Sequence, residues 1–201
     1  MTKLKICGLF RAADIAHVNA AGPDYIGFVF AKSRRQVTFA HALALRKLLR
    51  PGIVPVGVFV NAPQAEIVRL YREGIIEVAQ LHGGESRAYV ESLKQKGIPT
   101  IKAVRVESET DILEQMDSPA DYLLLDNGAG GTGTAFDWGV LSACTRPYFL
   151  AGGVNLGNIA EAIAHRPYCI DVSSGAETDG VKDGEKIRRL VETVHRDQCK
   201  A

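Results

Sequence analysis

The amino-acid sequence predicts a compact α/β protein with the (β/α)8, or TIM-barrel, fold in a single domain. Short apolar runs alternate with helical patterns along all 201 residues, and eight such units follow one another. Eight parallel strands, each followed by a helix, are what this barrel requires. Three late apolar runs also end in small residues, as in the phosphate site at one face of such barrels. An open doubly wound sheet is the alternative, but it does not explain glycine loops after three consecutive strands.

The expected strands are short and mostly apolar, as in a parallel sheet that is covered on both faces. They lie at about 3–7, 24–30, 54–60, 76–81, 98–104, 121–126, 147–151 and 168–173. The expected helices lie between them, at about 11–20, 41–49, 63–73, 85–96, 108–116, 137–143, 156–165 and 184–196. The chain is near the lower size limit of this barrel, ~200 residues, so we expect one domain over residues 1–201 without large insertions.

The charge balance gives no case for nucleic acid or a membrane surface as a partner. Lysine and arginine number 24 against 23 aspartate and glutamate, a net charge of +1. The first six residues carry lysines where a signal peptide needs an apolar run, and no stretch approaches ~18 uninterrupted apolar residues. We therefore expect a cytoplasmic protein whose partner is a small molecule rather than a nucleic acid or a membrane.

The four cysteines, Cys7, Cys144, Cys169 and Cys199, are far apart and show neither CxxC nor Cys/His spacing. They indicate neither a metal site nor a disulfide framework, and Cys144 and Cys169 are interpreted as packing residues. Cys7 differs because it ends the first strand, where catalytic groups of barrel enzymes lie. Nearby Lys5 could favour the thiolate that a catalytic role needs. The alternative is that Cys7 is a small buried hydrophobic residue.

Residues 121–138 combine a buried strand, a carboxylate at its end and a glycine-rich loop. Asp126 follows four apolar or aromatic residues, and burial would raise its pKa toward the working range of a general acid. Capping the segment that follows is the alternative role for this side chain. Asp126 is therefore a candidate catalytic acid.

Small residues follow the sixth, seventh and eighth expected strands, and their backbone N–H groups can turn toward a single anion. A flexible connection is the alternative for any one of these loops. Three of them together predict a site for a phosphorylated small molecule. The predicted phosphate-binding residues are Gly130, Gly131, Thr132, Gly133, Gly152, Gly153, Ser173, Ser174 and Gly175.

Several polar side chains occupy inward-facing strand positions or the loops at the barrel mouth. Lys5 and Asp171 become neighbours if the first and eighth strands pair, either as a structural ion pair or as catalytic groups. His82 is either a ligand-orienting or a structural histidine. Arg34 and Arg35 follow the second strand, where an arginine fork is suited to gripping a carboxylate, although paired arginines are also common in solvated loops.

Eight segments of the sequence match, in order, the pattern of one enzyme family. They are Lys5–Gly8, Gly27–Phe30 with Ser33–Arg35, Gly57–Asn61, Gln80–Gly83, Leu124–Asp126, Gly130–Gly133 with Phe136–Trp138, Ala151–Gly153 and Asp171–Gly175. The chain thereby resembles phosphoribosylanthranilate isomerase, the barrel enzyme of tryptophan biosynthesis, over its whole length. Eight ordered matches are a specific signal.

This resemblance implies an aldose–ketose isomerase. The expected reaction is the Amadori rearrangement of N-(5-phospho-β-D-ribosyl)anthranilate to 1-(2-carboxyphenylamino)-1-deoxy-D-ribulose 5-phosphate, with no cofactor and no metal. The family's general base corresponds to Cys7, its general acid to Asp126 and its clamp for the anthranilate carboxylate to Arg35, while His82 and Asp171 support them. Because this loop is slightly shorter than in some relatives, Arg34 remains a substitute for Arg35. The resemblance leaves open a monomer or a homodimer.

Two alternatives differ at the catalytic positions. Barrel isomerases of histidine biosynthesis perform the same rearrangement on a different aminoaldose, but they use an aspartate on the first strand where this chain has Cys7. A non-catalytic sensor of a phosphorylated metabolite would keep the glycine loops without needing Cys7 and Asp126 at strand ends. Loss of anthranilate fluorescence on turnover separates an enzyme from a sensor.

Overall fold

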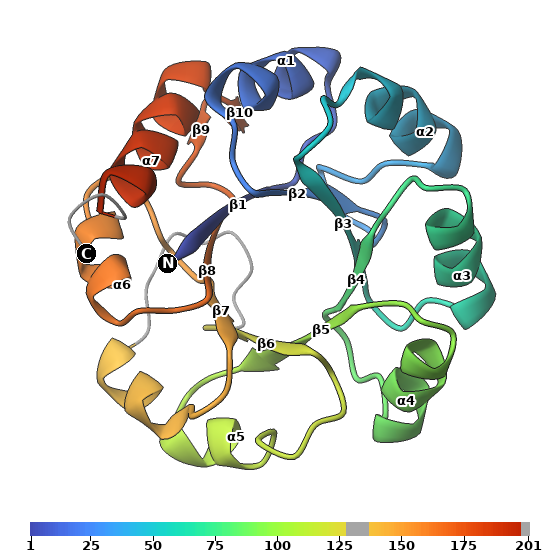
Figure 1. Ribbon diagram of the computed structural model, residues 1–201, viewed down its shortest axis with the longest axis vertical. Coiled ribbons are helices and arrows are strands. Elements are labelled where there is room, and N and C mark those ends of the chain that lie inside the picture. The colour runs from blue at the N-terminus through green and yellow to red at the C-terminus, as the bar shows by residue number, and fades with distance from the viewer. Residues whose placement is uncertain (128–136, 198–201) are drawn as a thin grey trace.

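Eight parallel strands close into a barrel in the order β1 to β8 in the computed structural model (Figure 1). The structure describes residues 1–127 and 137–197. The predicted TIM barrel is thereby confirmed. The strands are β1 (Lys3–Cys7), β2 (Tyr25–Val29), β3 (Val54–Phe59), β4 (Val78–Leu81), β5 (Thr100–Arg105), β6 (Tyr122–Asp126), β7 (Tyr148–Leu150) and β8 (Cys169–Val172).

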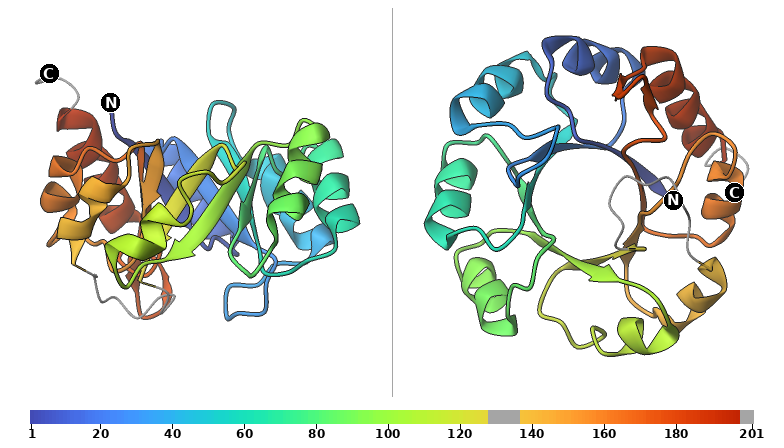
Figure 2. Two further views of the ribbon diagram at one scale, coloured as in Figure 1. Left: turned by 90° about the horizontal axis from the view of Figure 1, so that it is seen from below. Right: turned by 180° about the vertical axis from the view of Figure 1, so that it is seen from behind.

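Helices form a ring around the barrel, as Figures 1 and 2 show from opposite sides. They are α1 (Ala12–Ala21), α2 (Phe39–Leu48), α3 (Gln64–Arg72), α4 (Arg87–Gln95), α5 (Glu109–Leu113), α6 (Ile159–Ala164) and α7 (Gly184–Asp197), with the 3-10 helix η1 (Trp138–Ala143) between β6 and β7. Within residues 1–127 and 137–197, no helix has the length and apolar character that a membrane span needs.

The α-helix expected at 137–143 is instead the 3-10 helix η1, so this prediction was wrong. The segment is only six residues long, and Asp137 accepts a hydrogen bond from Gly139 N at 2.8 Å, which tightens its first turn. So short a segment gains few i→i+4 bonds, and the tighter 3-10 turn is common in such connectors. Longer helices carry ordinary caps, for example Thr38 Oγ1, which accepts from His41 N at the start of α2.

Lys5 and Asp171 lie side by side inside the barrel, because the register of β1 and β8 places them opposite each other. Their predicted proximity is confirmed: Lys5 Nζ donates to Asp171 Oδ2 at 2.8 Å and also to Gln80 Oε1 at 2.8 Å. Burial disfavours the ammonium, but the carboxylate of Asp171 outweighs it and raises the pKa of Lys5. Lys5 is therefore a charged ammonium that no solvent reaches.

An antiparallel hairpin, β9 (Glu177–Thr178) and β10 (Val181–Lys182), follows β8 and was not predicted. Figure 1 shows it between α7 and α1. Its turn is formed by Asp179 and Gly180, with φ of 51° and 81°. Two positive φ values match the type I′ turn that joins twisted strands, and Asp-Gly is a common sequence for it. The hairpin pairs Glu177 with Lys182 at the mouth of the barrel.

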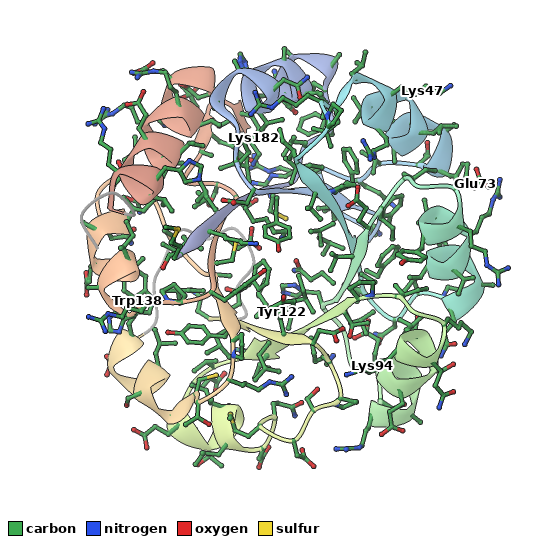
Figure 3. The ribbon with its side chains drawn as sticks, in the orientation of Figure 1. Lys47, Glu73, Lys94, Tyr122, Trp138 and Lys182 are labelled. Atoms are coloured by element: carbon green, nitrogen blue, oxygen red, sulfur yellow. The ribbon has the colours of Figure 1, made fainter. Side chains whose placement is uncertain are left out.

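Side chains fill one end of the barrel and leave the other hollow. An inner apolar layer includes Tyr25, Phe149 and Cys169, packed against Tyr122 and Tyr168, and the rings of Tyr122 and Tyr168 are stacked. Tyr122 points toward the barrel centre in Figure 3. These aromatic residues lie at or near the amino ends of their strands, so they close that end. The cavity at the carboxyl ends is consequently the place for a ligand.

Candidate active site

A cavity of about 300 Å³ opens at the carboxyl ends of the strands. A larger hollow of about 620 Å³ lies on the outer surface between α4 and α5, and none of the predicted site residues lines it. The cavity thus brings together most of the predicted site. Its lining includes the predicted residues Cys7, Arg35, His82, Asp126, Gly152, Gly153, Asp171, Ser173 and Ser174.

Cys7 ends β1 and projects into the cavity, with 8% of its surface exposed. Gly27 of β2 lies opposite it, and a Cβ atom at that position would come within 2.6 Å of Cys7 Sγ, so only glycine leaves room for the thiol. Burial raises the pKa of the Cys7 thiol and outweighs the opposite effects of Lys5 and Lys182. Lys5 therefore favours the thiolate, as expected, but does not by itself make Cys7 ionise.

Asp126 ends β6, three strands around the barrel from β1, and faces the same cavity. Only 7% of its surface is exposed. The loop after β7 packs directly on it: a Cβ atom at Gly152 would lie 2.8 Å from Asp126 Oδ1, and Gly152 has φ of 83°. Glycine is needed there both for the close approach and for the backbone conformation.

A chain of polar contacts crosses the barrel from Lys5 to Asp126. An ammonium can only donate, so the Gln80 atom that faces Lys5 is the amide oxygen. The amide nitrogen of Gln80 then donates to His82 Nδ1 at 3.0 Å. Burial lowers the pKa of His82, although Asp126 acts in the opposite direction. Neutral His82 accordingly carries its proton on Nε2, which lies 3.6 Å from Asp126 Oδ2.

Arg35 enters the cavity from the loop after β2 and is held there by Glu177. Its Nε and Nη2 donate to the two carboxylate oxygens of Glu177 at 2.7 and 2.8 Å. Its Cδ packs over Gly8, where a Cβ atom would come within 2.4 Å. Arg34 also donates to Glu177, at 2.6 Å, but its side chain is 56% exposed and does not line the cavity. The structure thus places Arg35 rather than Arg34 at the site.

The loops after β7 and β8 form the described part of the predicted phosphate site. Gly152 and Gly153 have φ of 83° and 72°, and within residues 1–127 and 137–197 their N–H groups donate to no backbone carbonyl. Ser173 and Ser174 line the same end of the cavity, and Gly175 forms a backbone bridge that ties the two loops together. The remaining predicted phosphate-binding residues, Gly130, Gly131, Thr132 and Gly133, lie outside the described residues.

Gln80 lines the cavity, Glu177 and Lys182 contact the lining residues Arg35 and Ser173, and none of the three was predicted as a site residue. The two-residue period places Gln80 on one inward face with His82, so its position could be predicted from the sequence, but its role could not. Glu177 lies two residues before the Asp-Gly turn of the hairpin and Lys182 two residues after it, so this dipeptide is the sequence signal that could have indicated the pair. Lys182, labelled in Figure 3, donates to Ser173 O at 2.9 Å and to Glu177 Oε1 at 2.7 Å.

Known proteins are similar to this chain in both sequence and fold. A family model described as N-(5'phosphoribosyl)anthranilate (PRA) isomerase matches residues 4–193. The N-(5'-phosphoribosyl)anthranilate isomerase of Endomicrobium trichonymphae is 46% identical over 200 residues, which cover 96% of this chain and 97% of the relative. The relative from Streptococcus pneumoniae (strain Taiwan19F-14) is 44% identical over 197 residues, 96% of each chain.

Solved structures of this isomerase are also similar to the chain. A crystal structure of phosphoribosyl anthranilate isomerase from Thermus thermophilus has a TM-score of 0.87 at 38% identity and covers 97% of this chain and 99% of its own. Another such isomerase, in complex with reduced 1-(o-carboxyphenylamino)-1-deoxyribulose 5-phosphate, has a TM-score of 0.86 at 32% identity, with 98% and 100% covered. The resemblance seen in the sequence is thereby confirmed, and the chain belongs to the N-(5'-phosphoribosyl)anthranilate isomerase family.

Proposed function

We propose that the cavity at the carboxyl ends of the strands is where this chain performs the reaction of its family. The chain is an aldose–ketose isomerase of tryptophan biosynthesis, and it converts N-(5-phospho-β-D-ribosyl)anthranilate to 1-(2-carboxyphenylamino)-1-deoxy-D-ribulose 5-phosphate. The observation that carries the assignment of the site is that Cys7 and Asp126 face one cavity from strands three apart around the barrel. A base and an acid can therefore reach one substrate from different sides.

In the proposed mechanism Asp126 acts as the acid and Cys7 as the base. Asp126 protonates the ring oxygen of the ribose, and the C1–oxygen bond breaks to give an open-chain Schiff base. Cys7 then removes the proton from C2, and the electron pair of that bond moves toward C1 and the nitrogen to give an enolamine. Protonation of C1 and loss of the C2 hydroxyl proton give the ketone. The isomerisation needs no external redox partner because C2 is oxidised from an alcohol to a ketone while C1 is reduced from an imine to an amine in the same molecule.

His82 supports the acid in this scheme. Its Nε2 proton faces Asp126 Oδ2 at 3.6 Å, and the contact from Gln80 to Nδ1 fixes that tautomer. The negative charge that forms on Asp126 as it releases its proton is stabilised by this N–H dipole. A neutral histidine suits the role because it does not compete with Asp126 as the proton donor. Asp171 supports Cys7 from the neighbouring strand by fixing the ammonium of Lys5.

The substrate phosphate is proposed to lie at the loops after β7 and β8, and the glycine-rich sequence at 130–133 is proposed to contribute to the same site. The N–H groups of Gly152 and Gly153, the serines and the positive φ values there support a backbone cradle for an anion. A Gly153→Val variant is expected to raise KM at least ~10-fold with a smaller change in kcat, since it blocks approach of the phosphate rather than the proton transfers. Steady-state kinetics measure this.

Gly52→Val is the matched control for backbone strain at the phosphate loop. Gly52 also has positive φ, 91°, but a Cβ atom there would contact nothing within 4 Å, and it lies far from the cavity, just before β3. We expect this control to lose stability without a change in KM. An unchanged KM in folded Gly153→Val protein would remove Gly153 from the phosphate site.

Arg35 is proposed to bind the carboxylate of the anthranilate ring. An Arg35→Lys variant is expected to lose ~1.5–3 kcal/mol of transition-state binding, about 10- to 150-fold in kcat/KM, because a point charge replaces a planar fork. Kinetics of Arg35→Lys, Arg35→Met and Arg34→Met measure the effect. If Arg34→Met were damaging and Arg35→Met harmless, the carboxylate would belong to Arg34.

We propose that residues 1–201 are one domain, that the enzyme is cytoplasmic and that it is a monomer or a homodimer, without a cofactor or metal. The mechanism with Cys7 as base and Asp126 as acid supports the proposal that no metal is needed, because neither proton transfer calls for a metal. Turnover should survive dialysis against a chelator, and light scattering should give the mass of one or two chains. A chelator-sensitive rate or a larger assembly would contradict these proposals.

A further inference from the structure

Glu177 is a buried carboxylate that joins three basic side chains at the mouth of the cavity. Only 4% of its side chain is exposed. It accepts from Arg35 at 2.7 and 2.8 Å, from Arg34 Nη2 at 2.6 Å and from Lys182 Nζ at 2.7 Å. Lys182 Nζ also donates to Ser173 O at 2.9 Å, next to the proposed phosphate loops. Glu177 therefore links the loop after β2 to the loop after β8.

The contact with Glu177 uses only one edge of the Arg35 guanidinium. Glu177 occupies Nε and one N–H of Nη2, whereas Nη1 donates to none of the described residues. A guanidinium carries five N–H donors, so the edge formed by Nη1 and Nη2 can still take a second carboxylate through two parallel bonds. Arg35 lines the cavity with 12% of its side chain exposed, and Gly8 supports its stem. The donors that remain are thus available to a ligand.

The charges around Glu177 favour an anionic ligand in spite of its own negative charge. Burial disfavours ionisation of Glu177, but Arg35 and Lys182 outweigh it and lower the pKa, so the carboxylate is ionised at neutral pH. Arg34, Arg35 and Lys182 supply three positive charges against one negative charge, which leaves a surplus of two. A ligand carboxylate at the open edge of Arg35 therefore meets a net positive field.

We propose that Glu177 is a positioning residue that holds Arg35 by its Nε edge, so that the opposite edge selects substrates whose aromatic ring carries a carboxylate. The inference rests on the proposed role of Arg35 and adds that Glu177 orients its guanidinium. A free arginine side chain loses rotamer entropy when it binds a ligand, whereas one already held by a buried partner has lost it beforehand. Glu177 thereby raises the preference for the acidic ring without touching the substrate.

The test compares two ligands that differ only in the carboxylate. Reductive amination of ribose 5-phosphate with anthranilate gives a reduced product analogue, and the same reaction with aniline gives its counterpart without the carboxylate. Calorimetry yields Kd for each ligand with wild type, Glu177→Gln, Arg35→Met and the double variant. The ratio of the two Kd values is the carboxylate preference, and weakened phosphate binding or general instability affects both ligands alike.

We expect wild type to prefer the carboxylate ligand by about tenfold or more, the range of one charge-assisted hydrogen bond. In Glu177→Gln the preference should fall by about three- to tenfold. In Arg35→Met it should nearly disappear, and adding Glu177→Gln should then change it no further, because the two residues act as one unit. Glu177→Asp keeps the charge and should recover part of the preference, and it replaces Glu177→Gln if that variant does not fold.

Glu85→Gln is the matched control. Glu85 and Glu177 are each 8% exposed as whole residues, and Glu85 is paired with a lysine, Lys102 at 2.9 Å, but among the described residues it forms no hydrogen bond or ion pair with an arginine. This variant should lose similar stability and keep the full preference.

Four outcomes would overturn the inference, and one of them would also overturn the proposed role of Arg35. If Glu177→Gln weakens both ligands equally, Glu177 only supports the fold. If it lowers the preference equally in the Arg35→Met background, it does not act through Arg35. If wild type shows no preference at all, the proposed role of Arg35 fails too. A preference that is lost in Arg35→Met but kept in Glu177→Gln and Glu177→Asp leaves the role of Arg35 intact and overturns only that of Glu177.

Discussion

A Cys7→Ser variant is expected to lose ~10²- to 10⁴-fold in kcat and to bind the product nearly as well as wild type. The serine hydroxyl fits the space that Gly27 leaves for the thiol, so the cavity keeps its shape. A hydroxyl ionises far less readily than a thiol and cannot accept the C2 proton as well. Fluorescence kinetics and a binding measurement with the product separate the two effects.

The pH dependence adds a second test of Cys7 as the base. The thiol must be ionised to remove a proton, and burial raises its pKa above the ordinary value of 9.0. The rising limb of kcat/KM should therefore extend to alkaline pH in wild type and be lost in Cys7→Ser. Near-full turnover in Cys7→Ser would mean that the base lies elsewhere. Asp171 is then the next candidate, because its Oδ1 is buried without a hydrogen-bond partner among the described residues.

An Asp126→Asn variant is expected to lose kcat in the same range, ~10²- to 10⁴-fold, with product affinity nearly unchanged. The amide has almost the shape of the carboxylate, so the close contact with Gly152 is kept. An amide N–H can donate a hydrogen bond to the ring oxygen but cannot transfer its proton. The measurement is steady-state turnover together with product affinity.

Asp121→Asn is the control for removing a carboxylate from the same strand region. Asp121 lies just before β6, where it accepts from Thr100 N at 2.8 Å, at the opposite end of the strand from the cavity. It should affect stability and leave kcat unchanged. If Asp126→Asn instead lost affinity for the product at full kcat, Asp126 would bind the substrate and the acid would be another group.

Most of the fold could be predicted because it depends on local patterns. Short apolar strands alternating with helices predict the barrel, and the barrel then makes Lys5 and Asp171 neighbours. The exceptions are segments where local signals are weak. Residues 137–143 are too few to distinguish an α-helix from a 3-10 helix by periodicity, and two-residue strands such as Glu177–Thr178 are too short to show alternation.

The site could be predicted where a residue's position on its own strand decides its place. Cys7 and Asp126 end strands that converge on one face, and the cavity joins them. The partners of Arg35 could not be predicted in this way. Glu177 lies 142 residues further along the chain, and nothing near Arg35 in the sequence indicates it. The orientation of Gln80 likewise depends on Lys5, from a strand that is distant in sequence.

The assignment of Asp126 to ring opening and Cys7 to removal of the C2 proton is tested most directly by a kinetic isotope effect. The substrate is prepared from anthranilate and ribose 5-phosphate deuterated at C2, and kcat/KM is compared with the unlabelled substrate in both variants. In Cys7→Ser the slow step is proton removal, so we predict a large primary isotope effect. In Asp126→Asn the slow step is ring opening, so the two rates should be nearly equal. A large effect in Asp126→Asn, or none in Cys7→Ser, would contradict the assignment.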